Sequence, residues 1–256
     1  MKERVALNPT FPSAVAPGAP LVRRDGRAPN ELRPVRIERG FVASSAGSAL
    51  YRAGGTMVLA TANLAEKVPP FLEGKGTGWL TAEYAMLPGS VPSRKSRGPD
   101  GRSTEIQRLI GRSLRAIVNF EILGPRTIHV DADVLQAEGG TRTAAITAAT
   151  IAVHDAVRQK LGAEMAAAIL KDTVAAISVG IVDGQPLLDL DYAEDVRADV
   201  DCNVVRLGSG GLIEVQGTGE RGSFSRSLLD QLLDLAELGI DQLTRLQLEQ
   251  LSQLVP

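Results

Sequence analysis

The sequence predicts an α+β fold in which mixed sheets are covered by helices. Strand-like segments come in groups, and segments with helical periodicity lie between and after these groups. The 256 residues are 44% hydrophobic and 23% charged, which is ordinary for a globular protein with a sizeable core. No apolar run reaches the roughly 18 residues that a membrane helix requires, so no membrane contact is expected.

A flexible arm is expected over residues 1–22, followed by a single domain over residues 23–256. Prolines interrupt the apolar part of this arm at Pro9, Pro12, Pro17 and Pro20, whereas a secretory signal requires an unbroken apolar region. The same prolines favour an extended, polyproline-like chain. Cys202 is the one cysteine, so no internal disulfide can form, which predicts a reducing, cytoplasmic location.

The strands of the first half are marked by alternation and by turn residues. Residues 48–64 read as two strands around Gly54 and Gly55, which is typical of a hairpin. Residues 78–88 predict another strand, which Pro88 ends. A basic loop rich in glycine, proline and serine follows over residues 89–102.

A helix is expected over residues 103–120, with Thr104 and Gln107 as a capping box. Its apolar stripe comprises Ile106, Leu109, Ile110, Leu114 and Ile117. A second stripe comprises Arg108, Arg112 and Arg115, which could face RNA, a neighbouring subunit or solvent.

A strand is expected near residues 126–135, and a second helix from about residue 140 to Leu161. This helix is built of alanine and threonine on all sides, so we expect it to be buried between layers at close approach. The last part predicts strands over residues 173–184, 186–195, 201–207 and 212–217, and then a leucine-rich amphipathic helix from Ser225.

The charges are polarised along the chain. Between Arg94 and Arg115 lie seven basic residues against two acidic ones, and between Asp183 and Asp201 lie seven acidic residues against one arginine. A basic patch can bind a polyanion, and crowded carboxylates can bind Mg²⁺ or Mn²⁺. Together these segments suggest phosphate chemistry with a metal.

The stretch "AEGGTRT" (137–143) joins a strand to the alanine-rich helix through two glycines. The free N–H groups and the dipole of a helix start favour an anion, which Gly140, Thr141 and Arg142 could hold. A tight turn with a surface arginine is the alternative. Arg102, at the start of the other helix, could meet the same anion or be an exposed loop residue.

The acidic segment contains two pairs of carboxylates. Asp189 and Asp191 are expected to alternate on one strand face, and Asp195 and Asp201 to flank a short turn. The pattern indicates a cation site or, alternatively, a solvated acidic edge. His129, His154 and Cys202 are expected to be structural, so any reaction should need no protein nucleophile.

Seven segments occur in the order found in one known family. They are "RDGR" with "ELRPV" (24–35), "GWLTAEYAMLP" (78–88), "GRSTEIQRLIGRSLRA" (101–116), "DADVLQAEGGTRTAAIT" (131–147), "VGIVDG" (179–184), "DLDYAEDVRADVDCNVV" (189–205) and "IEVQGTGE" (213–220). In these segments the chain resembles the ribonuclease PH family of phosphate-dependent 3′-exoribonucleases, which is related to exosome ring subunits and polynucleotide phosphorylase.

The resemblance implies a fold like domain 2 of ribosomal protein S5, with two βαβα-type halves. It also implies a homohexameric ring, a trimer of dimers, that trims the 3′ ends of tRNA and other RNA. Inorganic phosphate as co-substrate would be held by Arg102, Gly140, Thr141 and Arg142. Asp195 and Asp201 would be the catalytic or metal-binding carboxylates for Mg²⁺ or Mn²⁺, and Arg94 and Arg97 would hold tRNA.

The chain departs from the family pattern at several points. Gly89 stands where the family has arginine, and the loop up to Arg102 is several residues shorter. Glu138 replaces aspartate, Val196 replaces serine and Cys202 replaces methionine. A non-catalytic RNA-binding scaffold subunit and a hydrolytic nuclease are the alternative functions.

Overall fold

The computed structural model describes residues 22–98 and 100–253. The predicted arm therefore lies outside the described residues, apart from its last residue. In the described part of the chain, no helix combines the length and apolar character that crossing a bilayer demands.

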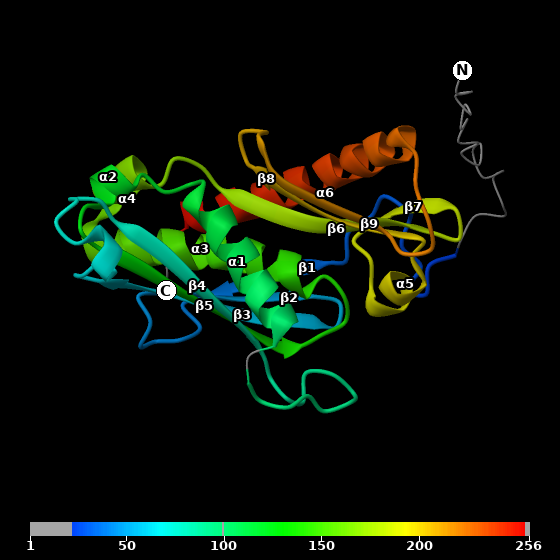
Figure 1. Ribbon diagram of the computed structural model, residues 1–256, viewed down its shortest axis with the longest axis horizontal. Helices are drawn as coiled ribbons and strands as arrows, with labels where there is room; N and C mark the ends of the chain where they lie inside the picture. The colour runs from blue at the N-terminus through cyan, green and yellow to red at the C-terminus, as the bar shows by residue number, and fades with distance from the viewer. Residues whose placement is uncertain (1–21, 99, 254–256) are drawn as a thin grey trace, which may run out of the picture.

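The fold consists of two sheets with helices packed between and around them, as predicted (Figure 1). In the first sheet the strand order is β1-β2-β3-β5-β4, with β4 and β5 parallel and the other neighbours antiparallel. In the second sheet the order is β7-β6-β8-β9, and all neighbours are antiparallel. The strands are β1 Val35–Arg39, β2 Gly47–Ala53, β3 Thr56–Ala65, β4 Trp79–Met86, β5 Thr127–Gln136, β6 Val174–Val182, β7 Gln185–Leu188, β8 Val200–Leu207 and β9 Leu212–Gly219.

Six α-helices accompany these strands in the described residues. α1 and α3 contact the first sheet, α3 also contacts β6 of the second sheet, and α6 packs against β6 and α3 (Figure 1). One continuous apolar core runs through both halves. The helices are α1 Gly101–Arg115, α2 Phe120–Leu123, α3 Thr141–Leu161, α4 Ala163–Ile169, α5 Tyr192–Arg197 and α6 Arg226–Ser252, with a short 3₁₀ turn at Pro70–Leu72.

The predicted hairpin at Gly54 and Gly55 is confirmed, and Gly54 has a φ of 54°. The predicted capping box of α1 is wrong. The helix starts at Gly101, because the Asp100 side chain accepts a hydrogen bond from the Ser103 N–H at 2.6 Å and so caps the helix itself. The helix also ends earlier than expected, at Arg115.

The predicted strand over residues 186–195 is correct only as far as Leu188, where β7 ends. Asp189 then adopts a left-handed conformation with φ 55°, and α5 follows. A capping box starts this helix, because the side chains of Asp191 and Glu194 each accept a hydrogen bond from the other's backbone N–H. Reciprocal capping stabilises a helix where alternation of apolar residues alone predicted a strand.

The burial expected for the alanine-rich helix α3 is confirmed, since it is buried along most of its length. Thr150 inside it satisfies its hydroxyl by donating to the carbonyls of Ile146 and Val174. The backbone of β2 approaches α3 closely at Gly47, where a Cβ atom would meet the Ala152 carbonyl and lie 2.6 Å from the Ala156 nitrogen. Small residues therefore determine the spacing between α3 and the first sheet.

We expect Gly47→Ala to lower the free energy of unfolding by about 3 kcal/mol, because the new methyl group meets backbone that cannot move locally. Urea denaturation of the variant and the wild type measures this difference. Gly89→Ala is the matched control, because nothing lies within 4 Å of a Cβ at that position. Equal denaturation midpoints for the two variants would contradict the close packing of β2 on α3.

Candidate phosphate and carboxylate site

A cleft of about 510 Å³ lies where α1, α3, α5, β8 and β9 meet. It brings together four residues that the sequence predicted for one site, Arg102, Arg142, Asp195 and Asp201. Arg102 lies in α1 and Arg142 in α3, whereas Asp195 lies in α5 and Asp201 in β8. The other lining residues are Glu105, Val196, Ala198, Asn203, Gln216, Thr218, Glu220 and Arg221.

The predicted site residues Gly140 and Thr141 lie at the start of α3 next to Arg142, but they do not line this cleft. Gly139 and Gly140 are consecutive left-handed residues, with φ 83° and 65°, and Gly140 provides no side-chain cap. Thr141 was expected to cap the helix or donate its hydroxyl. That hydroxyl accepts a hydrogen bond from Tyr84 at 3.0 Å, which leaves the Thr141 proton for another acceptor. Burial raises the pKa of Tyr84 and so keeps its hydroxyl protonated as a donor.

Arg142 is held in a fixed orientation beside this helix start. Its Nη1 donates to Gln216 Oε1 at 2.8 Å and forms an ion pair with Glu105 at 3.3 Å. The Gln216 amide also donates to Glu105, at 3.0 Å. Because the side chain is only 15% exposed and is oriented from β9 and α1, its remaining donors are pre-organised for an anion.

Arg102 is exposed at the first turn of α1. Among the described residues it forms no ion pair, so its guanidinium can bind an added anion. Arg102, Arg142 and Asp195 line the same cleft, and the positive charges of the two arginines oppose the rise that desolvation causes in the pKa of Asp195.

The carboxylates occupy the opposite wall. Desolvation raises the pKa of Asp201 to about 6, with a further contribution from the charge of Asp195. Desolvation by the cleft walls also raises the pKa of Asp195, against the opposing effect of the two arginines. Asn203 donates a weak hydrogen bond to Asp201 at 3.4 Å. Two desolvated carboxylates that repel each other favour a divalent cation between them.

The donor set fits such a cation in part. Carboxylate oxygens are the ligands that Mg²⁺ and Mn²⁺ prefer, but no group of three or more His, Cys, Asp or Glu side chains in the described residues is placed to hold a metal. Asp195 and Asp201 would therefore bind the ion together with water or substrate oxygens, as is usual for Mg²⁺ at phosphate sites.

The structure does not bring Arg94 and Arg97 to this cleft. Both are exposed in the loop between β4 and α1, and the intervening Lys95 forms an ion pair with Asp100 at 3.2 Å. Of the three arginines in the second stripe of α1, Arg108 is exposed, whereas Arg112 and Arg115 make contacts within the chain that the sequence did not predict. Arg112 binds Glu214 of β9 at 2.6 Å, and Arg115 lies 4.6 Å from the Trp79 ring, so both serve contacts within the chain.

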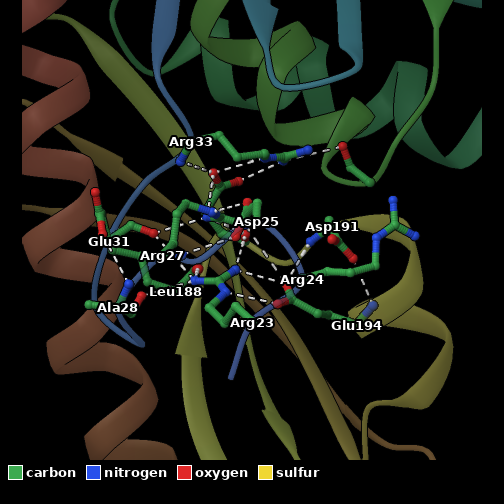
Figure 2. A network of polar contacts seen from close by, with 12 residues as sticks. Arg23, Arg24, Asp25, Arg27, Ala28, Glu31, Arg33, Leu188, Asp191 and Glu194 are labelled. Atoms are coloured by element: carbon green, nitrogen blue, oxygen red, sulfur yellow. Dashed lines mark hydrogen bonds and ion pairs between the residues drawn. The ribbon is translucent and has the colours of Figure 1, made fainter. Parts of the chain in front are cut away.

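The prediction that Asp189 and Asp191 share one strand face is wrong. Asp191 caps α5, and Asp189 is buried against Arg33, with Nη2 to Oδ1 at 2.7 Å. Figure 2 shows Arg23, Arg27 and Arg33 converging from the N-terminal segment onto this region. Arg27 and Arg33 lie in "RDGR" and "ELRPV", which carried no assigned role, and Arg23 directly precedes the first of these segments. Tyr84, Glu105 and Gln216 were not predicted as site residues either.

Glu138, Cys202 and His154 are held within the protein, whereas His129, which was also expected to be structural, is exposed on β5. The Glu138 carboxylate accepts a hydrogen bond from the Gly55 N–H at 2.7 Å, so this longer side chain ties the loop of Glu138, Gly139 and Gly140, called the anion loop below, to the β2–β3 turn. Cys202 is fully buried, and burial raises its pKa to about 11. His154 lies 3.2 Å from the Asp172 carbonyl, and burial lowers its pKa. Both residues are structural, as expected.

Two arginines beside a helix start, with a carboxylate pair in the same cleft, form an arrangement that suits a protein acting on phosphate groups. The sequence matches the family model "3′ exoribonuclease family, domain 1" over residues 31–159 and "domain 2" over residues 172–238. This chain belongs to the 3′ exoribonuclease family. Among curated proteins it is similar to a ribonuclease PH from Cyanothece sp., with 53% identity over 235 residues, which cover 90% of this chain and 98% of that relative.

Solved structures show the same fold. Rice Rrp46 matches with a TM-score of 0.74 and 21% identity, over 90% of this chain and 100% of that chain. An Archaeoglobus fulgidus exosome structure with RNA bound to the active site matches with a TM-score of 0.74 and 23% identity, over 86% of this chain and 91% of that chain.

We expect Asp201→Asn to stabilise the native state above a pH of about 6. An ionised Asp201 is less favourable in the folded chain than in the unfolded one, so the wild type loses stability as the pH rises from about 4 through about 6. Removing this charge should raise the free energy of unfolding at neutral pH by about 1 kcal/mol. Thermal denaturation at several pH values measures the effect.

The same variant tests whether Asp201 binds a divalent cation. Mg²⁺ should raise the melting temperature of the wild type and leave that of Asp201→Asn unchanged. Asp230→Asn serves as the control, because Asp230 is an exposed residue of α6 that pairs with Arg226. An equal response of Asp201→Asn and the wild type to Mg²⁺ would rule out Asp201 as a ligand.

Proposed function

We propose that this chain removes nucleotides from the 3′ end of RNA by phosphorolysis, releases nucleoside diphosphates and runs in reverse as a nucleotidyltransferase. The observation that carries the proposal is the cleft that Arg102 and Arg142 line together with Asp195 and Asp201. Membership of the 3′ exoribonuclease family and 53% identity to a ribonuclease PH support it.

Inorganic phosphate is the nucleophile in this proposal. It binds the N–H groups at Gly140 and Thr141, and Arg142, oriented by Gln216 and Glu105, neutralises its charge. Arg102 closes the anion site from α1. Because Cys202 is buried and protonated, and His154 is bound to a backbone carbonyl, no protein nucleophile competes with the phosphate among the described residues.

A phosphate oxygen attacks the phosphorus of the last phosphodiester bond, and the bond from phosphorus to the 3′ oxygen of the preceding nucleotide breaks. That oxygen takes the proton that the attacking hydrogen phosphate loses, which leaves a shortened RNA with a free 3′ hydroxyl and a nucleoside 5′-diphosphate. One phosphorus–oxygen bond forms as another breaks, so the step needs little besides alignment and charge neutralisation. Since the product contains the newly formed phosphoanhydride bond, the reaction is reversible.

The carboxylates complete the site. Asp195 and Asp201 would hold Mg²⁺ or Mn²⁺, which supplies positive charge beside the phosphoryl oxygens when it is bound. The cation also offsets the repulsion between the two carboxylates, so their unfavourable burial is best explained by this role.

The RNA substrate in this proposal is the 3′ end of tRNA and other structured RNA. Arg94 and Arg97 lie exposed on the loop before α1, where they can bind RNA phosphates outside the cleft. We further propose a homohexamer, a trimer of dimers, in the cytoplasm. The similar fold of the archaeal exosome, whose structure contains RNA at its active site, supports an assembly that binds RNA.

We expect Arg142→Ala to lower the rate of phosphate-dependent nucleoside diphosphate release by about 10²-fold or more, because it removes one pre-organised charge from the attacking group. The assay uses a tRNA with a 3′ extension, Mg²⁺, and either phosphate or none. Arg245→Ala is the matched control, since Arg245 is exposed on α6, away from the cleft.

Each other outcome contradicts part of the proposal. Release of nucleoside monophosphate without phosphate would indicate a hydrolytic nuclease. RNA binding without release of any nucleotide would indicate a scaffold subunit. Full phosphate-dependent activity of Arg142→Ala would remove Arg142 from the anion site.

A further inference from the structure

We propose that the buried pair Arg33–Asp189 is a positioning device that holds the anion loop and the carboxylate-bearing helix α5 in register. The inference rests on the proposed function, because it assigns the pair to the alignment of phosphate with Asp195. Neither residue lines the cleft, so the pair acts through the backbone.

Arg33 joins two segments that are far apart in the sequence. On one side its Nε and its backbone N–H donate to Asp189 Oδ2 at 3.0 and 2.8 Å, and Nη2 donates to Oδ1 at 2.7 Å. On the other side Nη1 donates to the Glu138 carbonyl at 2.7 Å and Nη2 to the Gly139 carbonyl at 3.4 Å. One planar guanidinium therefore bonds both the anion loop and the turn that follows β7 (Figure 2).

These contacts orient the donors of the anion loop. In a trans peptide the carbonyl and the N–H point in opposite directions. Because the Glu138 and Gly139 carbonyls face Arg33, the N–H groups of Gly139 and Gly140 face away from it. The Thr56 hydroxyl is a second donor to the Gly139 carbonyl, at 2.6 Å, besides the Arg33 guanidinium. The direction of the Gly140 N–H, one of the two groups that we propose bind phosphate, thus depends on the guanidinium behind it.

Asp189, the second residue of the pair, fixes the turn between β7 and α5. Its φ of 55° is unusual for a residue other than glycine, and such a conformation persists only where surrounding contacts fix it. Its carbonyl accepts hydrogen bonds from Arg23 at 2.9 Å and Arg27 at 3.1 Å. Its N–H donates to the Ser178 carbonyl at 2.8 Å. The turn at Asp189 therefore fixes where α5 begins.

Arg23 fixes α5 as well. Its Nε and Nη2 donate to the two oxygens of Glu194 at 2.8 and 2.7 Å, one residue before Asp195. The anion loop also touches the start of α5 directly, since a Cβ at Gly139 would lie 2.7 Å from the Leu190 carbonyl. A shift of the Arg33–Asp189 pair would displace the phosphate donors and Asp195 relative to each other.

A merely structural pair would stabilise the fold without aligning the site, and the chain contains a matched example. Arg39 and Asp155 form a buried ion pair with 4% and 3% side-chain exposure, against 5% and 6% for Arg33 and Asp189. Arg39 ends β1 and Asp155 lies in the last third of α3, and neither lines the cleft. The two pairs therefore differ in what they align rather than in how deeply they are buried.

The test compares Arg33→Lys with Arg39→Lys, each of which keeps a charge and loses the two-pronged hydrogen bond. We expect Arg33→Lys to raise the KM for phosphate on the order of tenfold or more, because misplacement of the anion site weakens binding and alignment. Arg39→Lys should lower the melting temperature and leave the KM for phosphate unchanged. Asp189→Asn is a second variant, because asparagine tolerates the left-handed conformation.

Phosphate binding is measured on the same proteins as the rise in melting temperature with increasing phosphate, without RNA. This rise should be present in the wild type and in Arg39→Lys and strongly reduced in Arg33→Lys and Asp189→Asn. The inference is overturned if both site variants fold and respond to phosphate like the wild type, or if Arg39→Lys loses the response equally. A wild type that binds phosphate but releases no nucleoside diphosphate would refute the proposed function alone, since the phosphate response still tests the pair.

Discussion

The packing of α3 between the two sheets is the constraint on which the rest of the structure depends. Alanine and threonine side chains let the backbone of β2 touch the helix at Gly47, while Thr147 and Thr150 meet β6 on another side. Because the backbone of α3 touches β2 of the first sheet and its threonines are hydrogen-bonded to β6 of the second, the helix cannot tilt or slide without breaking both contacts. The free donors at its N-terminus therefore have a fixed place, which an anion site requires.

The charged groups of the site have opposite consequences on its two walls: the carboxylates oppose folding, whereas the arginines are held in place by neighbouring residues. Asp195 and Asp201 are desolvated close to each other, which opposes folding at neutral pH. Arg142 is held by Gln216 and Glu105, and the loop behind it by Arg33. Groups that an anion and a cation would satisfy are left exposed to the cleft, whereas the groups that orient them are satisfied within the protein.

The local part of this arrangement could be predicted from the sequence. Alternation and glycines located the β2–β3 hairpin, and an unbroken run of small residues located α3 and its burial. The membership of Arg102, Arg142, Asp195 and Asp201 in one cleft was also predicted, because their segments occur in the order of a known family. Their chemical roles stay predictions.

The remaining part depends on contacts between distant residues. Asp189 and Arg33 are 156 positions apart, and spacing along the chain cannot indicate which arginine binds which carboxylate. The sequence predicted a strand where α5 forms, because the apolar pattern of these six residues is ambiguous. Reciprocal capping by Asp191 and Glu194 stabilises the helix instead. Arg112 and Arg115 were left open because the positions of Glu214 and Trp79 follow only from the tertiary fold.

The central claim is that the cleft uses inorganic phosphate as the attacking group. Phosphate labelled with heavy oxygen, supplied with RNA and Mg²⁺, tests it most directly through mass spectrometry of the released nucleotide. The account predicts nucleoside diphosphate whose terminal phosphate carries the label in full. Nucleoside monophosphate without label, at the same rate with or without phosphate, would contradict it.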